Sequence, residues 1–383
     1  MPIRSAHDAA GVPKPEKTHL RLGFVALNDV APLVAAKVLE FGHDHGLTLE
    51  LCRQPSWAAV RDKLLCGELD AAHALYGLVY GVQLGIGGPQ ADMAVLMVLN
   101  RNGQAITLSN RLARALKERG DLKRALSSLE RPAIFAQTFP TGTHAMWLYY
   151  WLASQGVHPL RDIESVVIPP PQMVDALADD KLDGFCAGEP WNEVAQARHA
   201  GKTVAVTSEI WPNHPEKVLT CRRDFVAAYP NTSRSLIQTM LEACRWLDSS
   251  RHRAEISTWL AAPDVIGVPK ELIAPRLLGN YQGAQLSQPS LPVSFFDGGA
   301  VNYPRPSDGL WFLTQYRRWG MLSGGHDDAA IASEISQTEL YREAAGRAGV
   351  AIPEDVRADV LCDGRIWDGR NPAAYVDGFA SNF

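Results

Sequence analysis

The stretch TFPTGTHAMWLYYWLASQG, residues 138–156, has the pattern of a strand end, a tight turn and the start of a helix. The turn contains Gly142 between Thr141 and Thr143, and His144 stands where the helix begins. A helix N-terminus presents unpaired N–H groups and a partial positive charge, which favour anions. Hydroxyls and an imidazole add donors. The stretch therefore predicts one wall of an anion site, although a single histidine there is also explained by local capping or packing.

The alternation of strand and helix continues outward from this stretch. Towards the N-terminus, LRLGFVAL is a compact apolar strand, PLVAAKVLEFGHDHG (residues 32–46) has a helical pattern, and LTLELCRQ alternates like a strand. SWAAVRDKLLCGELD follows as a helix with Ser56 as its N-cap. After residue 230 the chain changes to amphipathic helices such as SRSLIQTMLEACRWLDS. This order favours a parallel α/β architecture.

A weak internal repeat accompanies this pattern. WAAVRDKLLCGELDAAHAL begins at Trp57, and PQMVDALADDKLDGFCAGEP begins at Pro171. Each has a helix, a charged turn, a Leu-Asp pair and a strand of small residues. Two interpretations stay open: two unrelated α/β units that look alike, or two lobes of similar construction that offer loops to a shared cleft.

Length and composition indicate a globular protein. With 383 residues, the chain is long enough for two to three domains or for one protein of two lobes. Its net charge of −5 gives no basic excess that would favour direct binding of nucleic acid. No run approaches the ~18 apolar residues of a membrane span. The start, MPIRSAHDAAGVPKPEKTHL, lacks the features of a secretory signal, so we expect a cytoplasmic protein.

The familiar motifs of enzymes and metal sites are missing from the sequence. It contains no phosphate loop, nucleophile elbow, HExxH pair or strand–GxGxxG–helix fingerprint. The six cysteines are scattered without a CxxC pair, which predicts mostly buried free thiols in a reducing compartment. His43, Asp44 and His45 could bind a metal, but a solvated helix end explains them more simply. We therefore expect no catalytic residue, metal or cofactor.

Eight motifs together resemble the nitrate/nitrite-binding proteins of ABC transporters and their cytoplasmic relative, the nitrate sensor of the NasS type. In chain order they are LRLGFVALNDVAPLVAAK, QPSWAAVRDKL, LNRNGQAITLS, TFPTGTHAMWLYYWLASQGV, VVIPPPQMVDAL, FCAGEPWN, HPEKVL and GLWFLTQYRRWG. The resemblance covers the chain from about residue 18 to the C-terminus. It implies an α/β, two-lobed, periplasmic-binding-protein-like fold of type II, with a ligand in the cleft between the lobes. The expected division is a tail (1–17), lobe 1 (18–107 plus 216–383) and lobe 2 (108–215).

The resemblance also implies the residues that hold the oxyanion. They are the tryptophan of SW, the glutamine of NGQ, the histidine of GTH and the lysine of HPEK, which are here Trp57, Gln104, His144 and Lys217. The turn residues 141–143 adjoin this set. The chain departs from the family where a glycine often follows the tryptophan, because it has alanine at position 58.

These residue types suit nitrate, which offers three acceptor oxygens and no donor. Lys217 would supply charge, Gln104 and His144 directed hydrogen bonds, and Trp57 a flat face or an indole N–H. We expect loss of the ammonium in Lys217→Ala to weaken nitrate binding roughly tenfold or more. Since no carboxylate is assigned to the pocket, nitrate or nitrite should bind in preference to bicarbonate. Each residue also has an ordinary explanation, as core, strand-end cap or solvated lysine.

Three functions follow from the resemblance. The first is a cytoplasmic nitrate/nitrite sensor that holds an RNA-binding antiterminator of the NasT type until the anion releases it. This chain would then contact neither RNA nor membrane. The alternative is the substrate-binding component of a nitrate/nitrite ABC transporter. The third is an enzyme on the same fold, such as a thiamine-precursor synthase, which would need clustered cysteine and histidine ligands.

Overall fold

The computed structural model describes residues 14–287 and 289–379, and it contains two five-stranded mixed sheets and a short two-stranded one. The strand order is β2-β1-β3-β10-β4 in the first sheet and β7-β6-β8-β5-β9 in the second. The first sheet contains β1 (His19–Phe24), β2 (Thr48–Arg53), β3 (Ala71–Leu75), β4 (Met93–Val98) and β10 (Lys217–Arg222). The second contains β5 (Gln104–Ser109), β6 (Ala133–Gln137), β7 (Ile163–Val167), β8 (Gly184–Gly188) and β9 (Gly201–Val206). The short pair is β11 (Asp359–Val360) and β12 (Ile366–Trp367).

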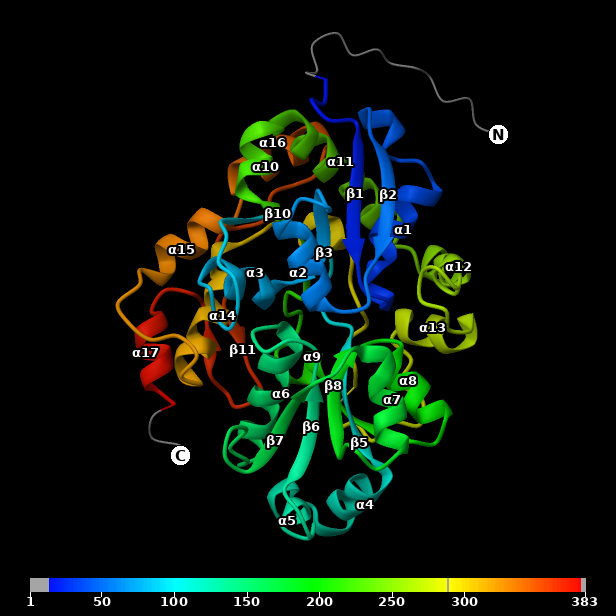
Figure 1. Ribbon diagram of the computed structural model, residues 1–383, viewed down its shortest axis with the longest axis vertical. Helices are drawn as coiled ribbons and strands as arrows, with labels where there is room; N and C mark the ends of the chain where they lie inside the picture. The colour runs from blue at the N-terminus through cyan, green and yellow to red at the C-terminus, as the bar shows by residue number, and fades with distance from the viewer. Residues whose placement is uncertain (1–13, 288, 380–383) are drawn as a thin grey trace.

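Helices cover both sheets, and the two sheets lie one above the other as separate lobes (Figure 1). The helices of the first half are α1 (Ala31–Val38), α2 (Trp57–Leu65), α3 (Tyr76–Gln83), α4 (Asn110–Arg119), α5 (Leu122–Leu126), α6 (Thr143–Ser154), α7 (Pro170–Ala178) and α8 (Trp191–Ala197). The others are α9 (Thr207–Ile210), α10 (Arg223–Ala228), α11 (Pro230–Trp246), α12 (Ser250–Leu260), α13 (Lys270–Leu277), α14 (Pro306–Arg318), α15 (Asp328–Ile335), α16 (Thr338–Arg347) and α17 (Pro372–Asp377). Three 3-10 turns are η1 (Asn28–Val30), η2 (His43–His45) and η3 (Asp297–Gly299). The predicted two-lobed α/β architecture is confirmed, but the expectation of parallel sheets is wrong in part, because β10 and β5 run antiparallel to their neighbours.

Local sequence signals explain several helix boundaries. The hydroxyl of Ser56 accepts a hydrogen bond from the backbone N–H of Ala59, so the predicted N-cap of α2 is confirmed. The helix predicted after the TFPTGT turn is also confirmed, since α6 begins at Thr143. The helix predicted over residues 32–46 is wrong in length, because α1 ends at Val38. Two residues later Glu40 has a φ of 57°, a left-handed conformation that cannot continue a helix.

The internal repeat corresponds to equivalent units of the two lobes. In the first lobe α2 leads into β3, and in the second α7 leads into β8. The backbone N–H of Asp70 bonds to the carbonyl of Arg21 in β1, and that of Asp183 bonds to the carbonyl of Ile134 in β6. The side chain of Asp70 also accepts a hydrogen bond from the backbone N–H of Arg21, and the side chain of Asp183 accepts one from the backbone N–H of Ile134. The two Leu-Asp pairs therefore perform the same task, namely anchoring a parallel strand to its neighbour.

The chain passes between the lobes at a set of adjacent segments. Arg101, between β4 and β5, forms isolated bridges with Pro215 before β10 and with Ser294 in a third segment. The expected first boundary was after residue 107, whereas β5 already begins at Gln104 and pairs with β8 and β9 of the second sheet. This difference matters for the site, because it assigns Gln104 to the second lobe.

The cysteines and the N-terminal tail differ in part from what the sequence predicts. Cys186, Cys221 and Cys244 are buried, while the remaining three cysteines are partly or fully exposed, so the expectation of mostly buried thiols is wrong. Residues 1–13 of the expected tail lie outside the described residues, but Lys17 donates its backbone N–H to Thr232. Within residues 14–287 and 289–379, no helix is long and apolar enough to cross a membrane. The same residues contain no group of three or more His, Cys, Asp or Glu side chains that could hold a metal ion.

Candidate functional site

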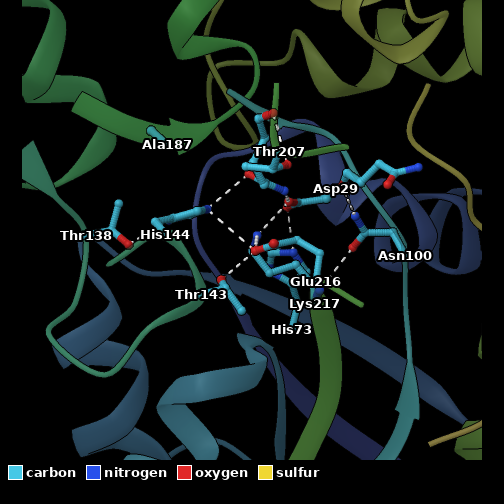
Figure 2. A network of polar contacts seen from close by, with 12 residues as sticks. Asp29, His73, Asn100, Thr138, Thr143, His144, Ala187, Thr207, Glu216 and Lys217 are labelled. Atoms are coloured by element: carbon cyan, nitrogen blue, oxygen red, sulfur yellow. Dashed lines mark hydrogen bonds and ion pairs between the residues drawn. The ribbon is translucent and has the colours of Figure 1, made fainter. Parts of the chain in front are cut away.

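The site is centred on Lys217, the first residue of β10, where the chain returns from the second lobe to the first sheet. Its Nζ lies 2.8 Å from Oδ2 of Asp29 in η1 and 2.8 Å from Oε1 of the preceding residue, Glu216. All three side chains are buried, and Figure 2 shows them within one network of polar contacts. Burial alone would lower the pKa of Lys217, but the two carboxylates together raise it. Lys217 is therefore an ammonium group held in the interior by two anions.

The two carboxylates differ in how they respond to burial. Burial opposes the ionised form of Asp29, but Lys217 and His73 outweigh it and hold the pKa of Asp29 well below its usual range. Burial raises the pKa of Glu216 above its ordinary value, although Lys217, Thr143 and Trp147 oppose the rise. Asp29 is thus the firmly charged partner of Lys217, and Glu216 is the partner that more readily takes up a proton.

Gln104 and His144 are linked to this group by a chain of hydrogen bonds. Gln104 Nε2 donates to Oδ2 of Asp29 at 3.0 Å, so its amide oxygen is left to accept from His144 Nε2 at 3.0 Å. His144 Nδ1 then accepts the hydroxyl proton of Thr138 at 2.7 Å. At the other end His73 Nε2 donates to Oδ1 of Asp29 at 2.8 Å. Burial lowers the pKa of both histidines, which favours their neutral form.

Trp57 completes the set as the first residue of α2. Lys217 Nζ lies 5.9 Å from the centroid of the Trp57 ring. The centroids of the Trp57 and His73 rings are 5.7 Å apart. Trp57 is fully buried, and its indole N–H has no hydrogen-bond partner among the described residues. A buried donor of this kind is costly unless a ligand satisfies it. The structure thus brings Trp57, Gln104, His144 and Lys217 together.

The turn residues 141–143 are placed differently from one another. Thr143 donates its hydroxyl to Oε1 of Glu216 at 2.5 Å, so it faces the centre of the site. Gly142 is the N-cap residue of α6. The carbonyl of Thr141 accepts the hydroxyl of Tyr316 from α14, which directs it towards the first lobe. Within this turn, Thr143 is therefore the residue whose side chain bonds to Glu216, the carboxylate next to Lys217.

Sequence reasoning missed four residues of this site. They are Asp29, His73, Trp147 and Glu216, and Trp147 donates its indole N–H to Oε2 of Glu216 at 2.6 Å. The pocket was expected to lack a carboxylate, and this expectation is wrong, because two carboxylates contact its cation. A signal was available for one of them, since HPEK places Glu216 directly before Lys217. Asp29 follows the end of β1, but nothing in its local sequence indicates a partner in β10.

The arrangement places a buried ammonium group and an indole N–H without a partner among the described residues at the junction of the two sheets, and both are groups that can bind an anion. A family model described as the NMT1-like family matches residues 13–261. The chain belongs to the NMT1-like family.

Curated relatives of this NMT1-like chain are transport and binding proteins. It is 38% identical over 371 residues to the nitrate import ATP-binding protein NrtC of Synechocystis sp., a match that covers 95% of this chain and 55% of NrtC. It is 34% identical over 383 residues to the nitrate/nitrite binding protein NrtA of the same organism, covering 95% of this chain and 85% of NrtA. It is also 32% identical over 369 residues to the bicarbonate transport ATP-binding protein CmpC of Synechococcus elongatus, covering 94% of this chain and 55% of CmpC. The chain therefore spans about half the length of NrtC and CmpC and most of NrtA.

A solved structure agrees with this membership. The periplasmic nitrate-binding protein NrtA from Synechocystis PCC 6803 has a TM-score of 0.88 and 33% identity, covering 95% of this chain and 99% of that one. The predicted periplasmic-binding-protein-like fold of this NMT1-like chain is thereby confirmed.

Proposed function

We propose that this chain binds nitrate between its two lobes, through Trp57, Gln104, His144 and Lys217. The observation that carries the proposal is a fully buried ammonium group at the junction of the two sheets, next to an indole N–H that lacks a partner among the described residues. The names of NrtC and NrtA support nitrate as the anion. Nitrate accepts hydrogen bonds and carries one charge, which matches these donors.

Binding should be coupled to movement of the lobes. The side chains of Trp57, Gln104, His144 and Lys217 are all inaccessible to solvent. An anion therefore reaches them only when the lobes separate, and a ligand that contacts both lobes favours the form in which they meet. Gln104 and His144 come from the second lobe, and Trp57 and Lys217 from the first. This division is what lets one anion connect the two.

The substrate-binding component of a nitrate importer is the role that the relatives support best, since NrtC is named as a nitrate import protein. The cytoplasmic sensor with a NasT-type antiterminator partner stays a prediction from the sequence. Two assays distinguish the roles. Nitrate-loaded protein that stimulates ATP hydrolysis by a reconstituted importer would support transport. An antiterminator complex that nitrate dissociates during size-exclusion chromatography would support the sensor.

Calorimetry with nitrate, nitrite, bicarbonate and chloride tests the ligand directly. We expect nitrate to bind and to compete with bicarbonate for one site. The preference for nitrate or nitrite over bicarbonate stays a prediction, and the Glu216 carboxylate weakens it, because a carboxylate can accept a hydrogen bond from bicarbonate that nitrate cannot donate. Bicarbonate that binds tightly while nitrate gives no heat would contradict the proposal.

Trp57→Phe should weaken nitrate binding about tenfold, because a hydrogen bond to a charged ligand contributes at least ~1.5 kcal/mol. The folded state should keep its stability, since the indole N–H of Trp57 bonds to no other described residue. Titration calorimetry and thermal unfolding measure the two effects separately. Trp246→Phe is the control, because Trp246 stacks on His252 at a ring distance of 4.2 Å and lies in α11 outside the site. Unchanged nitrate affinity in Trp57→Phe would remove the indole N–H from the site.

A further inference from the structure

The charges buried around Lys217 do not balance. Asp29 and Glu216 each lie 2.8 Å from the single ammonium group of Lys217. Three imidazoles lie near these carboxylates: His73 is 2.8 Å from Asp29, and His144 and His214 are 3.7 and 3.6 Å from Glu216. Burial lowers the pKa of each, for His214 to about 3. With neutral histidines and both carboxylates ionised, these groups have two negative charges and one positive charge, so they carry one negative charge in excess.

A bound anion would double this excess inside the protein. A buried charge without a partner is costly, and proteins usually avoid it by a change of protonation state. Nitrate is the anion of a strong acid and cannot hold a proton at neutral pH. A proton that compensates for the anion would therefore reside on the protein.

We propose that the anion enters this site together with one proton from solvent, and that the carboxyl group of Glu216 holds that proton. This inference rests on the proposed function and adds to it a dependence of binding on pH. The proton adds to a carboxylate oxygen of Glu216, and no other bond forms or breaks.

The contacts of the two carboxylates explain why Glu216 is the acceptor. Asp29 accepts from His73, Gln104 and Lys217, three groups that favour its charged form. Glu216 also accepts three hydrogen bonds, from Thr143, Trp147 and Lys217. It precedes a strand, however, whereas Asp29 lies in the first turn of η1, directly before α1, where a helix N-terminus favours an ionised carboxylate. Lys217, the charged donor to Glu216, is also the group that a bound anion would attract. The charge of Glu216 is then less well compensated, so its affinity for a proton increases.

The other titratable groups near Glu216 are less suitable. His144 Nε2 lies 3.7 Å from its Oε1, but the neighbouring Lys217 disfavours an imidazolium there. His214 Nδ1 lies 3.6 Å from its Oε2, and Arg101 and Arg357 add to the positive potential that opposes charging of His214. On β8, burial and Glu216 raise the pKa of the Cys186 thiol, which is therefore already protonated.

Titration calorimetry in buffers of different ionisation enthalpy measures this proton. Nitrate should be titrated at pH 7 in phosphate, HEPES and Tris, each with EDTA. We expect the observed heat to depend linearly on the buffer's ionisation enthalpy, with a slope equal to the uptake of about one proton per nitrate. Nitrate affinity should accordingly fall as pH rises, because the anion and the proton favour each other's binding.

Glu216→Gln supplies a permanently uncharged side chain at this position. Nitrate binding in this variant should proceed with a proton uptake close to zero and an affinity that no longer depends on pH. Glu209→Gln is the matched control, because Glu209 also has a raised pKa but bonds to Ser287 and Val206, away from Lys217. This control should keep the proton uptake of the parent protein.

If Glu216→Gln does not fold, Trp147→Phe gives a second test. It removes the donor to Oε2 of Glu216, which disfavours the carboxylate and should shift the pH of maximal proton uptake upward.

The outcomes separate this inference from the proposed function. A heat of nitrate binding that does not change with the buffer would overturn the inference and leave the proposal of nitrate binding intact. Proton uptake that persists in Glu216→Gln would move the proton to another group and reject the assignment. Binding that requires an added divalent cation, with no proton uptake, would show that a metal ion balances the charge. No nitrate heat in any buffer, together with no nitrate binding by equilibrium dialysis, would instead reject the proposed function.

Discussion

Replacing Lys217 by methionine should lower the free energy of unfolding by about 3–5 kcal/mol, the usual cost of removing one partner from a buried ion pair. The substitution leaves Asp29 and Glu216 buried without the ammonium group that contacts both. From the sequence alone, the expected consequence of losing Lys217 was a weaker affinity for nitrate. The structure adds a larger effect on stability, which chemical denaturation at pH 7 would measure.

The pH dependence of this variant provides a check on the cause. Without Lys217, the folded-state pKa values of Asp29 and Glu216 should rise above their unfolded values of about 4. The folded protein then binds more protons than the unfolded chain, so stability increases as pH falls from 8 to 5. The loss in Lys217→Met should accordingly be smaller at pH 5. A second substitution, Glu216→Gln, should recover part of the lost stability at pH 7.

Lys181→Met is the matched control, because Lys181 pairs with Asp179 in a mostly exposed salt bridge. Such pairs contribute about 0–1 kcal/mol. If Lys217→Met and Lys181→Met have the same free energy of unfolding, the ion pairs of Lys217 with Asp29 and Glu216 do not contribute to stability in solution.

Gly77→Ala should weaken nitrate binding about 5- to 150-fold, which corresponds to a cost of about 1–3 kcal/mol in the closed form. A Cβ at Gly77 in α3 would lie 2.2 Å from the carbonyl oxygen of Thr141 and 3.3 Å from the carbonyl carbon of Gly142. These backbone atoms belong to the second lobe, and the hydroxyl of Tyr316 lies between the two segments, 2.6 Å from the carbonyl oxygen of Gly77 and 2.7 Å from that of Thr141. The methyl group would therefore oppose closure and lower the fraction of protein that is competent to bind.

Two measurements separate this effect from a general defect. Titration calorimetry gives the affinity, and small-angle X-ray scattering with saturating nitrate shows whether the lobes stay apart. Gly346→Ala in α16 is the control, because a Cβ there would have no neighbouring atom within 4 Å. Both substitutions gain the same helix propensity, roughly 1 kcal/mol. A Gly77→Ala protein with parental affinity and a compact nitrate-bound form would show that closure does not depend on this contact.

Much of the framework was predictable because its causes are local. Ser56 caps α2 through the N–H of Ala59, three residues away, so the sequence contains both partners. The start of α6 at Thr143 follows from the turn residues before it. The early end of α1 escaped prediction, because the left-handed conformation of Glu40 has no glycine or proline to signal it. The lobe boundary was misplaced because β5 begins directly at the crossing.

The sequence by itself determined the alternation of strand and helix, the capping of α2, and the residue types Trp57, Gln104, His144 and Lys217 at their positions along the chain. The tertiary structure decided what those side chains contact. It places Asp29, in η1, 2.8 Å from the ammonium group of Lys217, at the start of β10. Electrostatic energy depends on distance through space and on the exclusion of water, and separation along the chain specifies neither. For this reason the lysine was predictable from the sequence, while its contact with two buried carboxylates became evident only from the fold.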